Sequence, residues 1–425
     1  MKYLFAGLML CNYMSLQAQE SMPLDSIPYY FQKTKEEFNI LKRLKIGGYF
    51  QTQWQMAETA GMSSFAGGNF APGVDNRFTV RRGRVRVSYT HSDVNLYMVT
   101  DGTEKGVSLK DAVITWNEPW TKSLSLRMGM FYKPFGFEID YSSSNRESPE
   151  RGRMSQVIFQ GERDLGVSVK FQNLKSKLFK PISLEVSLIN GSGNSVSDYD
   201  SYKDFLGRLR YSKLKEKNFS FGFGLSYYNG GINPGNKYIY EFTNQPNNRV
   251  YQLQDTNSVP TKLTKEYFGI DAQYGFYNLL GQTILRAEYI MGTQPGTINS
   301  SASMFVAISN DTYIRDFNGA YFYLIQDILK TKWQVLIKYD WFDPNSKIKA
   351  EEIPSNVVPG IEFKSVNLVD AKFSTLGLGI NYAATKELKF CFYYELIKNE
   401  SSQNLTSLKD DQKDNVLTIR SQYKF

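Results

Sequence analysis

The 425-residue chain contains 29 Phe, 29 Tyr and 5 Trp, yet its mean hydropathy is only -0.40. This aromatic and apolar content excludes a disordered tail or a collagen-like chain. The formal charge is +8, and a single His with two Cys argues against most zinc, iron–sulfur and histidine-triad chemistry, so we expect no cofactor or metal.

The first 18 residues are typical of a secretory signal peptide. Lys2 supplies the positive charge, residues 3–10 are apolar, and Ala18 is the small residue that signal peptidase needs. We therefore expect cleavage after Ala18, which leaves Cys391 as the single thiol. No later segment has the roughly 18 consecutive apolar residues of a transmembrane helix. The mature chain is expected to be either soluble and exported or a closed membrane-spanning barrel.

Residues 19–45 precede the first expected strand and are predicted to form a periplasmic arm. Residues 34–44 could instead form a short basic helix. The segment is too short for the plug domain of an active transporter, which favours passive diffusion.

Alternation with a two-residue period is the main pattern in the rest of the chain. In residues 218–228, for example, Phe219, Phe221 and Phe223 share one face while Ser220 and Gly222 share the other, which is strand periodicity. Sixteen such segments are predicted, an even number: 46–57, 77–90, 94–100, 107–116, 123–131, 164–172, 182–190, 204–211, 218–228, 265–276, 282–292, 316–326, 332–341, 372–383, 388–398 and 415–425.

Long and short connections alternate between these segments. The long ones are 58–76, 132–163, 191–203, 229–264, 293–315, 342–368 and 399–414, whereas 101–106 is intermediate, 173–181 is of modest length and the others are short. An up-and-down sheet with short periplasmic turns and long extracellular loops has this rhythm. A large secreted β-sandwich or propeller is the alternative, but it has no reason to sort its loops by length.

The two faces of the strands predict which side meets lipid. Their polar faces carry Gln51, Gln53, Gln55, Arg84, Arg86, Arg127, Lys170, Arg208 and Arg210. A barrel of sixteen strands encloses water, so these side chains can line its lumen while the apolar faces point outward. The last strand agrees, because Leu417, Ile419, Tyr423 and Phe425 share a face. We predict an all-β transmembrane antiparallel barrel of about 16 strands over residues 46–425.

Basic residues on the polar faces are the candidate anion sites. Residues 77–86 contain five arginines and no acid. A row of guanidinium groups on one wall would give an anion shallow, repeated sites. Arg82 shares the parity of Arg84 and Arg86, but so do the apolar Phe78 and Val80, so we expect a bulge or the strand's outer rim near residues 81–83. The predicted pore-lining residues are Arg81, Arg82, Arg84, Arg86, Arg127, Lys170, Arg208 and Arg210. At the rim, the arginines would instead bind lipopolysaccharide phosphates or pair with loop acids.

The connection at 132–163 is the candidate constriction, since a long loop after an early strand can fold into a pore. Its basic residues are Lys133, Arg146, Arg151, Arg153 and Arg163, and its acids are Glu138, Asp140, Glu147, Glu150 and Glu162. This balance leaves two interpretations open. The charges could create a transverse field that favours small zwitterions, or their pairing could merely rigidify the loop.

Three segments carry a resemblance to a known family. Residues 78–89 read FTVRRGRVRVSY, residues 110–116 read KDAVITW, and residues 129–138 read GMFYKPFGFE. In this order and spacing they resemble the phosphate-selective porin O/P family, and the clear match covers residues 77–165. The resemblance implies a sixteen-stranded trimeric porin of the outer membrane that favours anions, phosphate or polyphosphate among them.

These patterns together predict a passive diffusion channel of the bacterial outer membrane. Its expected partners are small anionic solutes, outer-membrane lipid and lipopolysaccharide, and two further copies in a homotrimer, but no nucleic acid. The alternatives are a sugar or peptide porin, a general porin without anion preference, and a surface adhesion barrel. An enzyme is not expected, because the single histidine, His91, lies in a predicted turn where no catalytic triad can assemble.

Overall fold

The computed structural model describes residues 40–173, 175–176, 179–194, 197–216, 219–245, 248–254, 257, 260–306, 311–354 and 362–425. The expected signal peptide and most of the expected arm lie outside the described residues. Of the alternative helix at 34–44, only residues 40–43 are described as helical.

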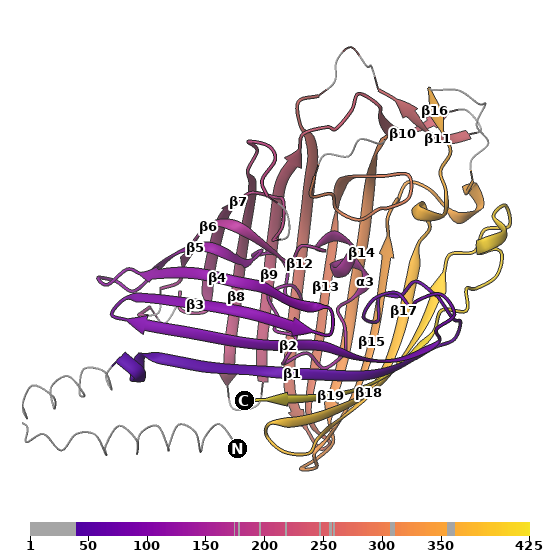
Figure 1. Cartoon of the computed structure of the whole chain (residues 1–425). Helices are drawn as coiled ribbons and strands as arrows, with labels where there is room; N and C mark the ends of the chain where they lie inside the picture. The colour runs from indigo at the N-terminus through magenta and orange to yellow at the C-terminus, as the bar shows by residue number, and fades with distance from the viewer. Residues whose placement is uncertain are drawn as a thin grey trace, which may run out of the picture.

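Sixteen antiparallel strands form a closed barrel (Figure 1). Each strand pairs with its neighbour along the chain, and β19 pairs with β1 to close the ring. The strands are β1 (Leu44–Ala57), β2 (Asn76–His91), β3 (Val94–Thr103), β4 (Gly106–Asn117), β5 (Leu124–Tyr132), β6 (Arg163–Phe171), β7 (Ile182–Ile189), β8 (Asp204–Glu216), β9 (Phe219–Ile232), β12 (Leu263–Asn278), β13 (Gly281–Gly296), β14 (Thr312–Asp327), β15 (Trp333–Asp343), β17 (Phe373–Ala383), β18 (Leu388–Asn399) and β19 (Val416–Lys424). Each overlaps one expected strand, so the predicted barrel is confirmed.

Short elements within the connections complete the fold. They are the strands β10 (Ile239–Gln245), β11 (Asn248–Leu253) and β16 (Phe363–Lys364), the helix α3 (Arg153–Ile158), and the 3-10 turns η2 (Ala350–Glu352), η3 (Leu368–Asp370) and η4 (Thr406–Leu408). β10 and β11 form a hairpin within a connection that the sequence pattern predicted only as a long loop. Tyr240, Tyr251 and Tyr313 pack there into a separate small core. Within the described residues, no helix is long and apolar enough to cross a membrane.

The connections segregate by length, as predicted, with one difference. Short turns such as 92–93, 279–280 and 384–387 lie at one end of the barrel, and the long loops lie at the other. The exception is 104–105, a two-residue turn at the long-loop end, where an intermediate connection was expected. β3 and β4 stay paired as far as Thr103 and Gly106. The φ of Gly106 is +129°, a conformation that lets the chain reverse direction within the two-residue turn.

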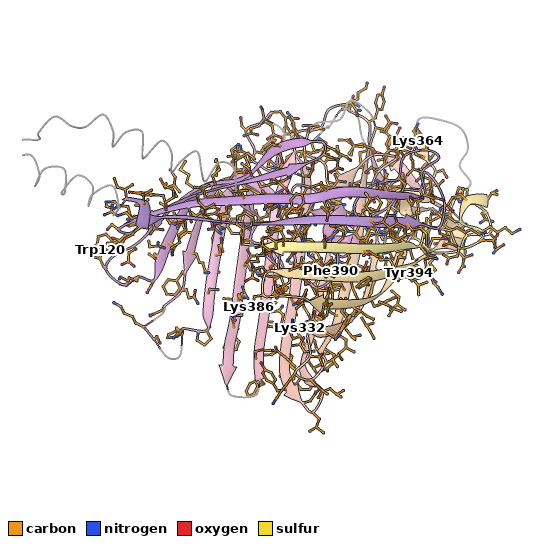
Figure 2. All side chains as sticks on the ribbon, turned by 60° about the horizontal axis from the view of Figure 1, so that its bottom comes forward. Trp120, Lys332, Lys364, Lys386, Phe390 and Tyr394 are labelled. Atoms are coloured by element: carbon orange, nitrogen blue, oxygen red, sulfur yellow. The ribbon has the colours of Figure 1, made fainter. Side chains whose placement is uncertain are left out.

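The outer face of the barrel is apolar and the inner face is polar. On β9, Phe219, Phe221 and Leu225 are exposed, whereas Gly224 and Ser226 are buried on the luminal side. Figure 2 shows this outer surface, with Phe390 and Tyr394 on it, Trp120, Lys332 and Lys386 toward the short-turn end and Lys364 toward the long-loop end. Apolar side chains outside and charges inside are the reverse of a water-soluble barrel.

Candidate functional site

The connection between β5 and β6, residues 133–162, lies inside the barrel. Figure 1 shows its helix α3 within the ring of strands, and most of its side chains are buried. Its residues contact inner-face side chains of β1, β2, β9, β13, β14, β17, β18 and β19. We call this segment the lumen loop. It narrows the lumen by crossing from one wall to the other.

Glu288 on β13 anchors the start of the lumen loop. Its carboxylate accepts hydrogen bonds from the backbone N–H groups of Phe137 and Glu138, both at 3.0 Å, and from the Tyr321 hydroxyl at 2.7 Å. The neighbouring Gly136 N–H donates to Ser226 Oγ at 3.0 Å. Gly136 has a φ of +62°, a conformation that glycine adopts without strain and that turns both N–H groups toward the acid.

Glu150 anchors the far side of the lumen loop to the seam where the barrel closes. Its carboxylate forms ion pairs with Arg81 (2.8 Å), Arg82 (2.8 Å) and Arg420 (2.7 Å). Burial alone would raise the pKa of Glu150, but attraction by the three arginines outweighs burial and holds the pKa well below its ordinary value.

A β-bulge lets two adjacent arginines reach this one acid. The register between β1 and β2 passes from Gln51 opposite Arg82 to Thr52 opposite Val80, so that Arg81 has no partner across the strands. Such a bulge changes the direction of the bulged side chain. Arg81 and Arg82 therefore both turn toward Glu150, and the bulge lies within residues 81–83, where the parity conflict predicted an irregularity.

Among the described residues, four of the five basic residues of the predicted constriction contact an acid or an aromatic ring, and the fifth, Arg146, does not. Lys133 pairs with Asp164 at 3.2 Å, Arg151 pairs with Glu162, and Arg163 pairs with both Asp111 (2.8 Å) and Glu162 (2.9 Å). Arg153 lies over the rings of Phe65 and Phe373. Arg146 is buried, and within the described part of the chain none of its three side-chain nitrogens has a hydrogen-bond partner.

Most predicted pore-lining cations on the strands also face an acid. Arg84 pairs with Asp101 at 2.9 Å, Arg127 pairs with Glu185, and Arg208 contacts Asp271 at 3.4 Å. In the part of the chain that the structure describes, Arg86, Lys170 and Arg210 form no ion pair. The sequence patterns identified the cations but missed these acids. Asp101, Glu185 and Asp271 share the luminal parity, and this is the signal that could have revealed them.

A cavity of about 470 Å³ lies between the lumen loop and the inner wall of β1–β5. We call this cavity the vestibule. Its charged lining consists of Arg84, Arg86, Arg127, Arg163 and Lys424 against Asp111 and Asp140. Arg86 is exposed, and its guanidinium carbon lies 4.2 Å from the centre of the Tyr97 ring. Stacking on this ring orients the guanidinium without neutralising it.

Comparison with known proteins gives one family and a set of similar folds. A family model described as phosphate-selective porin O and P matches residues 74–296. No curated protein matches the sequence. The fold is similar to OprB of Pseudomonas putida (TM-score 0.57, 11% identity, 92% of this chain and 97% of the other). It is also similar to the outer-membrane channel DcaP of Acinetobacter baumannii (TM-score 0.53, 14% identity, 90% and 97%) and to a trimer form of OmpT of Vibrio cholerae (TM-score 0.50, 8% identity, 90% and 99%).

Proposed function

Because the chain belongs to the phosphate-selective porin O and P family, we propose that this outer-membrane porin passively conducts small anions, phosphate or polyphosphate among them, in preference to cations. Passive conduction needs only a solute gradient and a water-filled path. The preference for anions must come from an excess of positive charge along that path.

The charge of the vestibule is the observation that carries this proposal. Five basic side chains line it against two acidic ones. Arg86 contributes most directly, because it is exposed and has no carboxylate partner in the described part of the chain. An anion that reaches Arg86 meets a forked donor that can bind two of its oxygens. The contact is open to water, so the anion can also leave.

The pairing of the other cations favours a second candidate function, a general porin with little anion preference. Arg84, Arg127 and Arg163 each pair with an acid, which reduces their attraction for a passing anion. A lumen of neutralised pairs would admit neutral solutes such as sugars or peptides as readily as anions. The two candidates differ in whether the unpaired positive charge of Arg86 governs permeation.

The reversal potential of the purified porin in planar bilayers tests the proposal. Under a potassium chloride gradient we expect a chloride-selective potential, and added phosphate should reduce the chloride current by competing for the vestibule. Arg86→Gln should move the reversal potential toward zero. The matched control is Arg249→Gln, in the hairpin at the long-loop end, where Arg249 pairs with Glu352 at 2.9 Å. The control should keep the wild-type potential.

An unselective or cation-selective current in the wild type would contradict the anion preference. A selectivity that Arg86→Gln leaves unchanged would contradict the role of the vestibule. In either case the general porin would become the better description, and swelling of porin-containing liposomes in sugars of increasing size would measure its solute range.

Export and assembly complete the proposal. Residues 1–18 would be removed as a signal peptide, residues 19–45 would remain in the periplasm, and the barrel of residues 46–425 would assemble as a homotrimer that contacts lipid and lipopolysaccharide. Two features support this: the apolar outer face and the trimer form recorded for OmpT. N-terminal sequencing of the mature protein and its mass in detergent, measured by light scattering, test these points. We assign the protein no enzymatic activity.

A further inference from the structure

Arg146 of the lumen loop is a buried cation without a partner among the residues that the structure describes. The residue is only 3% exposed, and Nε, Nη1 and Nη2 all lack an acceptor there. A guanidinium is charged at any ordinary pH and brings five N–H donors. To bury it with no acceptor and no counter-charge is strongly unfavourable. The structure therefore indicates that a ligand is needed beside this side chain.

A small cavity lies beside Arg146, between the lumen loop and the closing strands of the barrel. Its lining is mainly polar and contains three basic side chains, Arg146, Lys389 and Arg420, against one acid, Glu147. It encloses about 10 Å³, which is room for one water molecule or one single-atom ion. It is too small for phosphate.

The charges around this cavity do not balance. Both acids at hand are already engaged, because Glu147 binds Arg286 at 3.0 Å and Glu150 binds three arginines. Lys389 donates to the carbonyl of Arg146 at 3.0 Å and forms no ion pair in the described chain. Arg146 and Lys389 therefore leave two positive charges uncompensated at one cavity.

Two carbonyl groups of the lumen loop near the cavity already accept hydrogen bonds. Glu147 O accepts from Asn381 at 3.0 Å and Ser144 O accepts from Gln422 at 2.9 Å. A water molecule in the cavity would leave the two charges uncompensated, because water is neutral. A single-atom anion accepts hydrogen bonds and donates none. It therefore satisfies several N–H donors and at the same time lowers the net positive charge of the cavity.

We propose that this cavity is a binding site for one halide ion, chloride in the cell, held by Arg146 and Lys389, with Arg420 beside it in the lining. The ion joins the lumen loop to β18 and β19 through contacts that neither side can make alone. It is a fixed part of the folded barrel and is independent of which solutes the channel conducts. Removal of halide loosens the lumen loop on this side.

Crystals of the wild-type porin grown in sodium bromide give the direct test. Bromide scatters anomalously, so an occupied site produces an anomalous difference peak beside the Arg146 guanidinium. We expect that peak in the wild type and its loss in Lys389→Gln. Density without an anomalous signal would mean that water fills the cavity, and this result would overturn the proposal.

The temperature of unfolding in detergent gives an independent test. Replacing gluconate by chloride at constant ionic strength should raise the unfolding temperature of the wild type with a saturable dependence on concentration. Lys389→Gln should abolish that rise. The matched control is Lys386→Gln in the turn of the same hairpin, where the exposed lysine lies outside the cavity, and it should keep the rise.

Arg146→Gln provides a second variant, because it removes the unpaired guanidinium itself. If it folds, its unfolding temperature should be the same in chloride and gluconate. If it fails to fold, the bromide crystals and Lys389→Gln still decide the question. Equal unfolding temperatures of the wild type in the two salts would overturn the proposal.

Discussion

Three arginines from two strands converge on the single carboxylate of Glu150. Arg81 and Arg82 come from β2, and Arg420 comes from β19. β2 and β19 are the two strands that pair with β1, so Glu150 connects the lumen loop to the strands on both sides of β1. Removal of one member of a buried ion-pair network leaves the others uncompensated, which typically costs about 3–5 kcal/mol.

Glu150→Gln should therefore lower the unfolding temperature of the barrel in detergent at pH 7. The pH dependence should change as well. Because the pKa of Glu150 is lowered on folding, its contribution is fully present above the ordinary carboxyl pKa near 4.5 and is lost as the pH falls through the lowered value. Wild-type stability should fall in acid, and the variant should lose part of that dependence.

The control for this prediction is Glu351→Gln, since Glu351 is exposed at the long-loop end of the barrel. Equal stability of the wild type and Glu150→Gln at pH 7 would show that the arginines find other partners.

Residue parity along the strands predicted which cations face inward, but it did not predict their ion pairs. Alternation placed Arg84, Arg127 and Arg208 on the polar faces. Their acids lie on the adjacent strand or on the strand beyond it, at distances that depend on register and on the curvature of the barrel wall. Arg86 and Arg146 were both predicted as site residues. Only the packed structure distinguishes the exposed Arg86 from the buried, unpartnered Arg146.

At the scale of elements, the lumen loop depends on a backbone conformation that only one residue type adopts easily. A Cβ atom added at Gly136 would lie 1.8 Å from Glu288 Oε1. The positive φ adds a further cost of about 1–2 kcal/mol for any L-residue. The loop therefore cannot keep both the Glu288 anchor and a side chain at this position.

Gly136→Ala should release the start of the lumen loop from β13. Single-channel recordings should then show a changed conductance with increased current noise. Gly73→Ala is a matched control, because Gly73 also has a positive φ of +76° but has no neighbouring atom within 4 Å of the added Cβ. A conductance equal to the wild type in Gly136→Ala would contradict the anchoring role of Glu288.

Strand periodicity predicted all sixteen barrel strands because each pattern is local. The β10–β11 hairpin was not predicted, since it is stabilised by contacts with β14 and β16 and not by alternation. Likewise, the sequence identified residues 132–163 as a long connection, but its passage across the lumen follows from anchors that lie on distant strands.

At the scale of the whole molecule, the two ends of the barrel face different compartments. The long-loop end should be outside the cell and the short-turn end should be in the periplasm. Lys409 lies in the loop 400–415, and Lys386 lies in the turn 384–387; both are exposed. Cys391 is buried and free, and Cys11 would be removed with the expected signal peptide, which would leave a silent background for thiol labelling.

Intact cells treated with a maleimide linked to a polymer too large for the channel should label Lys409→Cys and not Lys386→Cys. Disruption of the cells should make both variants reactive. Labelling of Lys386→Cys alone in intact cells would show that the barrel has the opposite orientation.

The sequence by itself determined the class of fold, the approximate number of strands, the polarity of each face and the sorting of connections by length. These properties are local, because side chains alternate along each strand and turns are encoded by short segments. The tertiary structure alone decided how the charges combine. Closure of the ring brings Arg420 beside Arg81 and Arg82, and the lumen loop places Glu150 between them. Which cations are neutralised and which stay available to an anion depends on distances between residues far apart in the chain, and sequence patterns do not contain those distances.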